Sequence, residues 1–369
     1  MTYADEAHNA LPIDLLPLAW GWMNALAEEW GCYWVLASGS LVRYWALPRL
    51  MAFRIPQPNV CELVPEHLRA ELMQYETGRI RFQWEPEPLS RQALCQRVQA
   101  SLGPRLLILN TVQSAAVFAS DLCDAYGREA VEHLSTALTA ADRAAASERI
   151  KKRLQDQTDT DWTLVATSCV EAGVDFSFRT GFREVSSLLS LLQAAGRVNR
   201  HGTESEAEMW SFRLKDDSMM RPNKALHIEQ EVLQRYFMKR MEITPELSTG
   251  FLNDVLAQDG SCLQKISSLL QEEENLEFAD IEEKFKVIEE NTVLAVVDEA
   301  LAKRILFGKA DWTELQKNSV SVRKSNIRAW NLKEIGDGLY QWTLRYDPFL
   351  GYMRGVLDME RAKHGFLNC

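Results

Sequence analysis

Residues 105–205 are predicted to form an α/β domain whose parallel sheet is covered by helices on both faces. Short apolar runs typical of buried strands alternate there with longer segments of helical apolar spacing. Arg105 to Asn110 is the first strand, and a helix with one apolar face follows it from Val112 to Tyr126. Thr139 opens a capping-box pattern for a second helix. The remaining elements are a strand at 163–167, a strand after the turn at 173–175 and a long helix at 186–200.

The segments on either side of this domain differ from it in predicted secondary structure and in charge. Residues 1–50 predict a strand, a loop, a helix and a strand, whereas several prolines between 48 and 104 indicate an irregular connector. Beyond residue 205, charged helices run to about 290, and strand-like segments follow at 292–297 and 339–346. We therefore expect four parts, at 1–50, 51–104, 105–205 and 206–369, of which the last is an α-rich C-terminal domain.

The composition is that of an ordinary globular protein with reduced thiols. The 369 residues are 46% hydrophobic and 25% charged, and no uncharged apolar run approaches a membrane span. Seven cysteines without a C-x-x-C pair argue against a zinc site or a disulfide framework, so we expect a cytoplasmic protein without a membrane partner. The net charge of −11 argues mildly against nucleic-acid binding, although much of the acid lies between Glu272 and Glu290.

The first candidate site is the tetrapeptide Asp5-Glu6-Ala7-His8. Hydrolysis of a nucleoside triphosphate needs one carboxylate to hold Mg²⁺ and a neighbour to orient the attacking water. Two adjacent acids at the carboxyl end of a strand supply this pair, because ligands bind at such ends in α/β proteins. Taken alone, the pair also fits a solvated loop or a helix cap.

The second candidate is the segment from Gln193 to Arg200. A continuous helix would place Gln193, Arg197 and Arg200 on one face, with the apolar residues on the other. Two guanidiniums held rigidly in this way could stabilise the charge of a transferring γ-phosphoryl group, and Gly196 would allow close backbone approach. The plain alternative is a solvated polar face.

Hydroxyl and amide side chains follow two of the predicted strands. Asn110 and Thr111 come after the first strand, and Thr167 and Ser168 after the one at 163–167. Such groups at a strand end can bind phosphate, as can the amides that start the next helix. Gly173 and Asp175 follow one short turn later. Each hydroxyl also fits the simpler role of a helix N-cap.

Together and in this order, these segments resemble the motifs of superfamily 2 helicases. Asp5-Glu6-Ala7-His8 is similar to motif II, Ser38-Gly39-Ser40 to motif III and residues 107–111 to motif IV. Residues 166–175 and 193–200 are similar to motifs V and VI. The sequences of these two motifs resemble those of the CRISPR-associated helicase-nuclease family of type I systems. Residues 285–293 and 346–351 resemble the accessory domain of the same family. The resemblance implies a RecA-like second lobe at 105–205 and the tail of a first RecA-like lobe at 1–50.

The resemblance also implies roles, with ATP and Mg²⁺ as cofactors. Asp5 would hold Mg²⁺, Glu6 would activate water, and His8, Ser38 and Ser40 would couple the lobes. Five residues would contact the nucleotide: Gln193, Arg197, Arg200, Gly173 and Asp175. Four residues would contact the backbone of single-stranded DNA: Asn110, Thr111, Thr167 and Ser168. The implied activity is DNA unwinding after recruitment by an RNA-guided, Cascade-type surveillance complex.

Two departures from the family pattern leave other functions open. No G-x-x-x-x-G-K-S/T phosphate-binding loop (Walker A) and no His-Asp dipeptide of the HD nuclease occur in the sequence. We therefore expect an upstream half carrying both, and little ATPase activity without it. The alternatives are a non-catalytic truncated or split subunit that binds DNA or the surveillance complex, and a DEAH-type RNA helicase.

Overall fold

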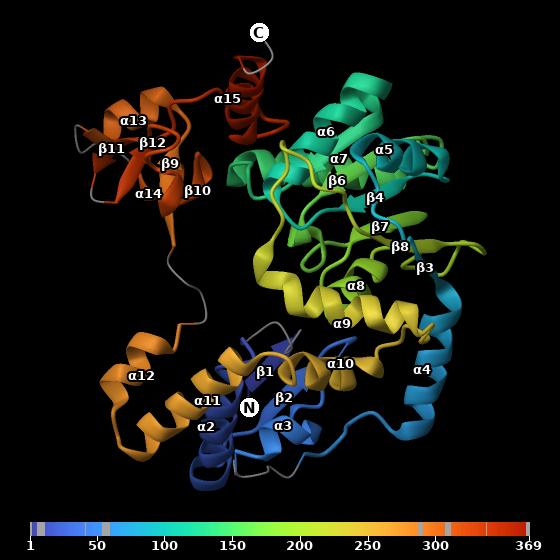
Figure 1. Ribbon diagram of the computed structural model, residues 1–369, viewed down its shortest axis with the longest axis vertical. Coiled ribbons are helices and arrows are strands. Elements are labelled where there is room, and N and C mark those ends of the chain that lie inside the picture. Colours follow the sequence, from blue (N-terminus) through green and yellow to red (C-terminus); the bar gives the residue numbers. More distant parts are fainter. Residues whose placement is uncertain are drawn as a thin grey trace. The chain divides into compact units, whose positions relative to one another are not determined.

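The computed structural model describes residues 2–5, 12–40, 42–53, 60–286, 291–306, 311–336 and 338–366, with only the backbone for 3–5 and 364–366 (Figure 1). The chain divides into two compact units. Unit one comprises residues within 1–78, 186–193 and 225–289, and unit two comprises those within 79–185, 194–224 and 290–369.

Unit two is built on a six-stranded parallel sheet in the order β3-β8-β7-β4-β6-β5. Its strands are β3 (Arg81–Trp84), β4 (Arg105–Ile108), β5 (Val131–Leu134), β6 (Thr163–Ala166), β7 (Thr180–Glu184) and β8 (Glu208–Phe212). The central strand β4 is apolar and fully covered, as expected for a parallel sheet flanked by helices. The predicted α/β fold is confirmed.

Side-chain caps begin the helices that cover this sheet. They are α5 (Arg91–Ala100), α6 (Val112–Tyr126) and α7 (Ala140–Gln155). The hydroxyls of Ser90, Thr111 and Thr139 accept hydrogen bonds from the amides of Ala93, Ser114 and Asp142, respectively. These bonds satisfy amides that have no partner inside the helix, so the caps fix where each helix starts.

The C-terminal part of unit two adds a smaller sheet in the order β10-β9-β12-β11. Its elements are β9 (Thr292–Val296), α13 (Glu299–Leu306), α14 (Trp312–Lys317), β10 (Ser319–Arg323), β11 (Lys333–Gly336), β12 (Leu339–Gln341) and α15 (Met353–Phe366). The strands expected at 292–297 and 339–346 are thus present, the second in shortened form. Helix α15 packs against α6, and the two sheets share one hydrophobic core.

Unit one consists of a two-stranded parallel sheet and helices. Strand β1 (Thr2–Asp5) pairs with β2 (Trp34–Ala37), so the strand, helix and strand expected in 1–50 are found. The helices are α2 (Leu16–Trp30), α3 (Pro48–Met51), α4 (Glu66–Arg79), α9 (His227–Met238), α10 (Leu247–Leu256), α11 (Gly260–Glu274) and α12 (Phe278–Lys284). Helix α11 packs on α2, and Lys265 forms an ion pair of 2.5 Å with Asp14.

The expected boundaries need two corrections. Residues 206–369 were expected to form one C-terminal part, but 225–289 belong to unit one and the rest belong to unit two. Residues 51–104 were expected to form an irregular connector, but they contain α4, β3 and α5. Strand β3 pairs with β8 at the edge of the large sheet, so the sheet begins at Arg81 and ends at Phe212. The prolines at 86 and 88 lie in the short loop between β3 and α5, where they interrupt neither element.

Candidate functional site

The carboxyl ends of β4, β6 and β7 form one edge of the large sheet. Ile108 of β4 is aligned with Ala166 of β6 on one side and with Arg183 of β7 on the other. The segments that follow these strands therefore start side by side, and those after β4 and β6 hold the residues expected to contact nucleic acid. This edge of a doubly wound sheet is where such folds bind ligands.

At the end of β4, Asn110 and Thr111 are already hydrogen-bonded within the fold. The Asn110 amide N–H donates to a carboxylate oxygen of Glu184 at 2.8 Å, and its side-chain Nδ2 donates to the carbonyl of Val185 at 2.8 Å. The Asn110 side-chain oxygen accepts from Arg183 at 2.6 Å. Thr111 caps α6, which is the simpler of its two expected roles. Both residues remain half-buried rather than fully covered.

The two hydroxyl residues after β6 differ in exposure. Thr167 is buried, with 7% of its surface exposed, and its hydroxyl lies 3.5 Å from the Cys169 sulfur. Ser168 is exposed and begins a short 3-10 helix. The exposed Ser168 is therefore the better placed of the pair for a contact with phosphate.

The next turn holds the two residues expected to bind the nucleotide. Gly173 has a φ of +74°, a conformation that favours glycine, and Asp175 follows with a largely exposed side chain. Arg200 Nε lies 2.9 Å from the Asp175 carboxylate, so the ends of motifs V and VI meet in an exposed ion pair.

Motif VI departs from its expected shape. Helix α8 (Leu188–Ala195) ends before both arginines, so Gln193, Arg197 and Arg200 do not share a helix face, and that expectation is wrong. Beyond Ala195 the chain pairs instead with Phe178: the Phe178 amide donates to the Arg197 carbonyl at 2.9 Å, and the Asn199 amide donates to the Phe178 carbonyl at 2.7 Å. Asn199 has a φ of +44°, which turns the chain away from the helical path.

The two arginines consequently have different surroundings. Arg197 is 8% exposed, and its guanidinium donates to the carbonyls of Val170 and Glu171 at 3.0 and 2.7 Å. It therefore clamps the motif V turn to the motif VI turn. The Arg200 side chain is 40% exposed and forms the ion pair with Asp175. Of the two guanidiniums, the one on Arg200 is the more accessible to a phosphate.

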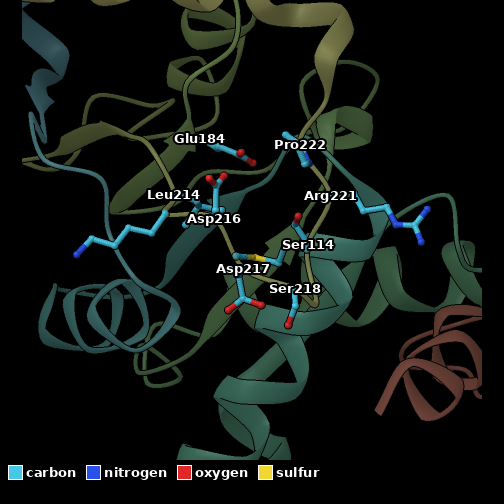
Figure 2. Close-up of a pocket in the computed structure, with 10 residues that line it drawn as sticks. Ser114, Glu184, Leu214, Asp216, Asp217, Ser218, Arg221 and Pro222 are labelled. Carbon is cyan, nitrogen blue, oxygen red and sulfur yellow. The ribbon is translucent and has the colours of Figure 1, made fainter. Parts of the chain in front are cut away.

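A hollow beside the strand ends is lined by acidic groups. Figure 2 shows Glu184, Asp216 and Asp217 around it, with Ser114 from the first turn of α6 and Arg221 extending away. Burial raises the pKa of Glu184, although the hydrogen bond from the Asn110 amide opposes this shift. Because carboxylates repel phosphate and outnumber Lys215 and Arg221 in the lining, this hollow is an unfavourable site for a nucleic-acid backbone.

The candidate residues of unit one are described only in part. Glu6 and His8 lie outside the described residues, and for Asp5 only the backbone is described, at the carboxyl end of β1 beside Ala37. A carboxylate there is the oxygen ligand that Mg²⁺ takes in proteins. In motif III, the Ser38 hydroxyl accepts from the Ser40 amide at 3.2 Å, and the buried Ser40 hydroxyl has no hydrogen-bond partner among the residues that the structure describes.

Three residues at the sheet edge have contacts that the motifs did not predict: Glu171, Arg183 and Glu184. Arg183 and Glu171 form an ion pair of 2.9 Å with side chains 3% and 8% exposed. A charged residue inside an apolar parallel strand was the available signal, because buried arginines are almost always paired.

Among the described residues, no group of three or more His, Cys, Asp or Glu side chains is arranged to hold a metal ion. Within the same part of the chain, no helix is both long and apolar enough to span a membrane.

Comparison with known proteins finds a similarity to one family over part of the large sheet. Residues 102–203 match the family described as CRISPR-associated nuclease/helicase Cas3, C-terminal. Over 43 residues the chain is 44% identical to a CRISPR-associated nuclease/helicase Cas3 from Haloferax volcanii. This matched stretch covers 12% of this chain and 5% of that protein.

Solved structures show the same fold over most of the chain. T. fusca Cas3-ATP is similar with a TM-score of 0.62 and 15% identity, covering 95% of this chain and 53% of that one. A chain of a CRISPR RNA-guided surveillance complex, pre-nicking, is similar with a TM-score of 0.57 and 14% identity, covering 95% and 56%. The chain thus spans about half the length of these solved relatives. Residues 102–203 are thus similar to the C-terminal part of the Cas3 nuclease/helicase family, and most of the chain shares the fold of the solved Cas3 structures.

Proposed function

We propose that the chain is the C-terminal motor part of an ATP-dependent helicase or translocase that unwinds target DNA in CRISPR antiviral defence. The observation that carries this proposal is the exposed Arg200–Asp175 ion pair, held where the motif V and motif VI turns meet. The clamp by Arg197 fixes both turns, so an accessible guanidinium stands on a rigid base. Preorganised positive charge of this kind is what phosphoryl transfer requires.

In this proposal the nucleotide contacts the motif V and VI turns. Arg200 stabilises charge on the γ-phosphoryl group, and Asp175 holds its guanidinium in place when no nucleotide is bound. Gln193 and Gly173 lie on the same two segments and complete this side of the site. Mg²⁺, held by Asp5, would neutralise charge on the phosphate oxygens. Glu6 would orient the attacking water, and His8, Ser38 and Ser40 would transmit closure of the site.

The nucleic acid is proposed to be single-stranded DNA that crosses the carboxyl edge of the large sheet. Ser168 and the half-buried Thr111 and Asn110 supply neutral polar groups there, while Thr167 supports the turn from beneath. Such contacts are made to the backbone, so binding should be independent of sequence and should weaken as salt rises. The partners proposed for the assembled motor are a Cascade-type surveillance complex and an upstream half with the phosphate-binding loop and the HD nuclease.

Phosphate release by the chain combined with a polypeptide that carries the phosphate-binding loop tests this function. We expect DNA-stimulated turnover from the combination and none from the 369-residue chain alone, because the sequence has no such loop. Arg200→Ala should lower turnover by about 10³-fold. Arg179→Ala is the matched control, because Arg179 also forms a partly exposed ion pair in unit two, with Glu204. Equal turnover by the wild type and Arg200→Ala would refute the assignment.

The second candidate is a module that binds DNA or the surveillance complex without ATP turnover. The missing phosphate-binding loop favours it for the chain by itself. The same experiment separates the two functions. If the combined polypeptides bind single-stranded DNA but never hydrolyse ATP, the binding module is correct.

A further inference from the structure

Arg183 belongs to no helicase motif, and it lies at the centre of a path of buried polar contacts. It is the fourth residue of β7, its surface is 3% exposed, and it is aligned with Ile108 of the central strand. A guanidinium has five N–H donors in a planar fork, so one side chain can hold several acceptors in fixed directions.

One branch of the fork reaches the end of β4. Arg183 Nη1 donates to the side-chain oxygen of Asn110 at 2.6 Å and to the carbonyl of Glu184 at 3.0 Å. The remaining groups of Asn110 are bound to Glu184 and Val185, so the motif IV end is fixed mainly by β7 and the residue after it.

The other branch reaches the motif V turn. Arg183 Nε lies 2.9 Å from the carboxylate of Glu171, and the backbone carbonyl of Glu171 accepts from Arg197 at 2.7 Å. Glu171 thus contacts one arginine through its side chain and the other through its backbone. A continuous path runs from Asn110 through Arg183 and Glu171 to Arg197.

We propose that Arg183 is a positioning residue that couples the nucleic-acid end of the sheet to the turn that carries Arg200. Movement of Asn110 on contact with a phosphate shifts the Arg183 fork, then Glu171, and then the Arg197 clamp beside Arg200. This inference rests on the proposed nucleic-acid contact. A coupling of this kind is reciprocal, so occupancy of the Arg200 side would also change affinity for the strand.

The alternative is that Arg183 only stabilises the lobe. If Arg183 is only structural, its substitution will change hydrogen exchange equally with and without nucleic acid. If Arg183 couples the two sites, its substitution will change the effect of nucleic acid on hydrogen exchange. Arg105 gives a matched control, because it is also a buried guanidinium in the same sheet, with hydrogen bonds to Asp161 at 2.6 Å and to Ser101 at 2.7 Å. It lies at the amino end of β4, away from the motifs.

The test is hydrogen exchange of the chain with and without a saturating oligothymidylate of about 16 nucleotides. The reporters are the amides of Phe178 and Asn199, which hold the turn between Arg197 and Arg200. In the wild type we expect the oligonucleotide to slow their exchange about fivefold or more. In Arg183→Lys, which keeps the charge but loses the fork, the effect should fall below about twofold. Arg105→Lys should retain the wild-type effect.

Glu171→Gln keeps the side-chain shape and tests the next step of the same path if Arg183→Lys does not fold. A wild-type response in either folded variant would overturn the coupling, and so would oligonucleotide binding to the wild type without any change at the reporters. Failure of the oligonucleotide to bind the wild-type chain, measured by fluorescence anisotropy, would instead refute the proposed nucleic-acid function.

Discussion

Protonation of one buried histidine should weaken the attachment of the C-terminal segment to the large sheet. His133 of β5 is 1% exposed, and its Nδ1 lies 2.6 Å from the carbonyl oxygen of Phe349. Because a carbonyl oxygen only accepts, Nδ1 carries the proton, and Nε2 is a buried acceptor without a partner in the described part of the chain. Arg128 stacks on the Phe349 ring at 3.8 Å, and the Tyr346 hydroxyl donates to Asp142 nearby.

The size of the effect follows from the pKa of His133. Folding lowers this pKa from 6.5 to about 4, mainly because burial disfavours the charged ring; Phe349 and Asp347 oppose the shift and Arg128 adds to it. Below pH 6.5 His133 binds a proton in the unfolded chain but stays neutral in the folded chain. The free energy of unfolding therefore falls as the pH decreases toward 4. At 1.36 kcal/mol per pKa unit, the loss is about 2 kcal/mol at pH 5 and about 3 kcal/mol at pH 4.

Urea unfolding followed by circular dichroism from pH 7.5 to 4.5 measures this loss in the wild type and in His133→Asn. The side-chain amide of the introduced asparagine can still donate to Phe349 but cannot be protonated, so the substitution removes the titration and keeps the hydrogen bond. We expect the wild type to lose about 2 kcal/mol more than the variant between pH 7.5 and pH 5. Carboxylates titrate in both proteins and cancel in the difference. Parallel pH profiles would refute this account of His133.

Two further substitutions, each paired with a control substitution, test the same unit. Gly351→Ala should cost about 3 kcal/mol or more in urea unfolding, because its φ is +64° and a Cβ would collide with the Ala137 carbonyl; Gly338→Ala, with a φ of +70° but open space, should cost only about 1 kcal/mol, and equal costs would contradict the packing argument. Glu184→Gln should strengthen oligothymidylate binding about threefold in fluorescence anisotropy, since it removes a negative charge beside Asn110 of the proposed strand path; Glu148→Gln on α7 removes the same charge elsewhere, and an equal gain there would show that only net charge matters.

Local patterns predicted the centre of the large sheet and the starts of its helices. The apolar runs at β4 and β6 could only be buried strands between helices, and the hydroxyls of Thr111 and Thr139 were recognisable as caps. Strand β3 was missed because Arg81 and Gln83 break its apolar character; the alternation with Phe82 and Trp84, typical of an edge strand, was the available signal.

The end of α8 could not be read from periodicity. Val198 continues the apolar spacing of the helix and is fully buried, as the pattern required. It is buried for another reason, since Val198 forms a parallel β-bridge with Phe178. A long-range backbone pairing of this kind leaves no local signature, and it separates the roles of the two arginines.

The two arginines therefore differ in the free energy needed to release the guanidinium from its present partners. Removing Arg197 would leave two buried carbonyls without their charged donor, so a phosphate could recruit its guanidinium only at a cost of about 3 kcal/mol or more. The Arg200–Asp175 pair is exposed on both sides and contributes at most about 1 kcal/mol. A γ-phosphate carries more charge than one carboxylate and can therefore displace Asp175 at little cost. For this reason the proposed transition-state contact falls on Arg200, and Arg197 acts through the turn that it holds.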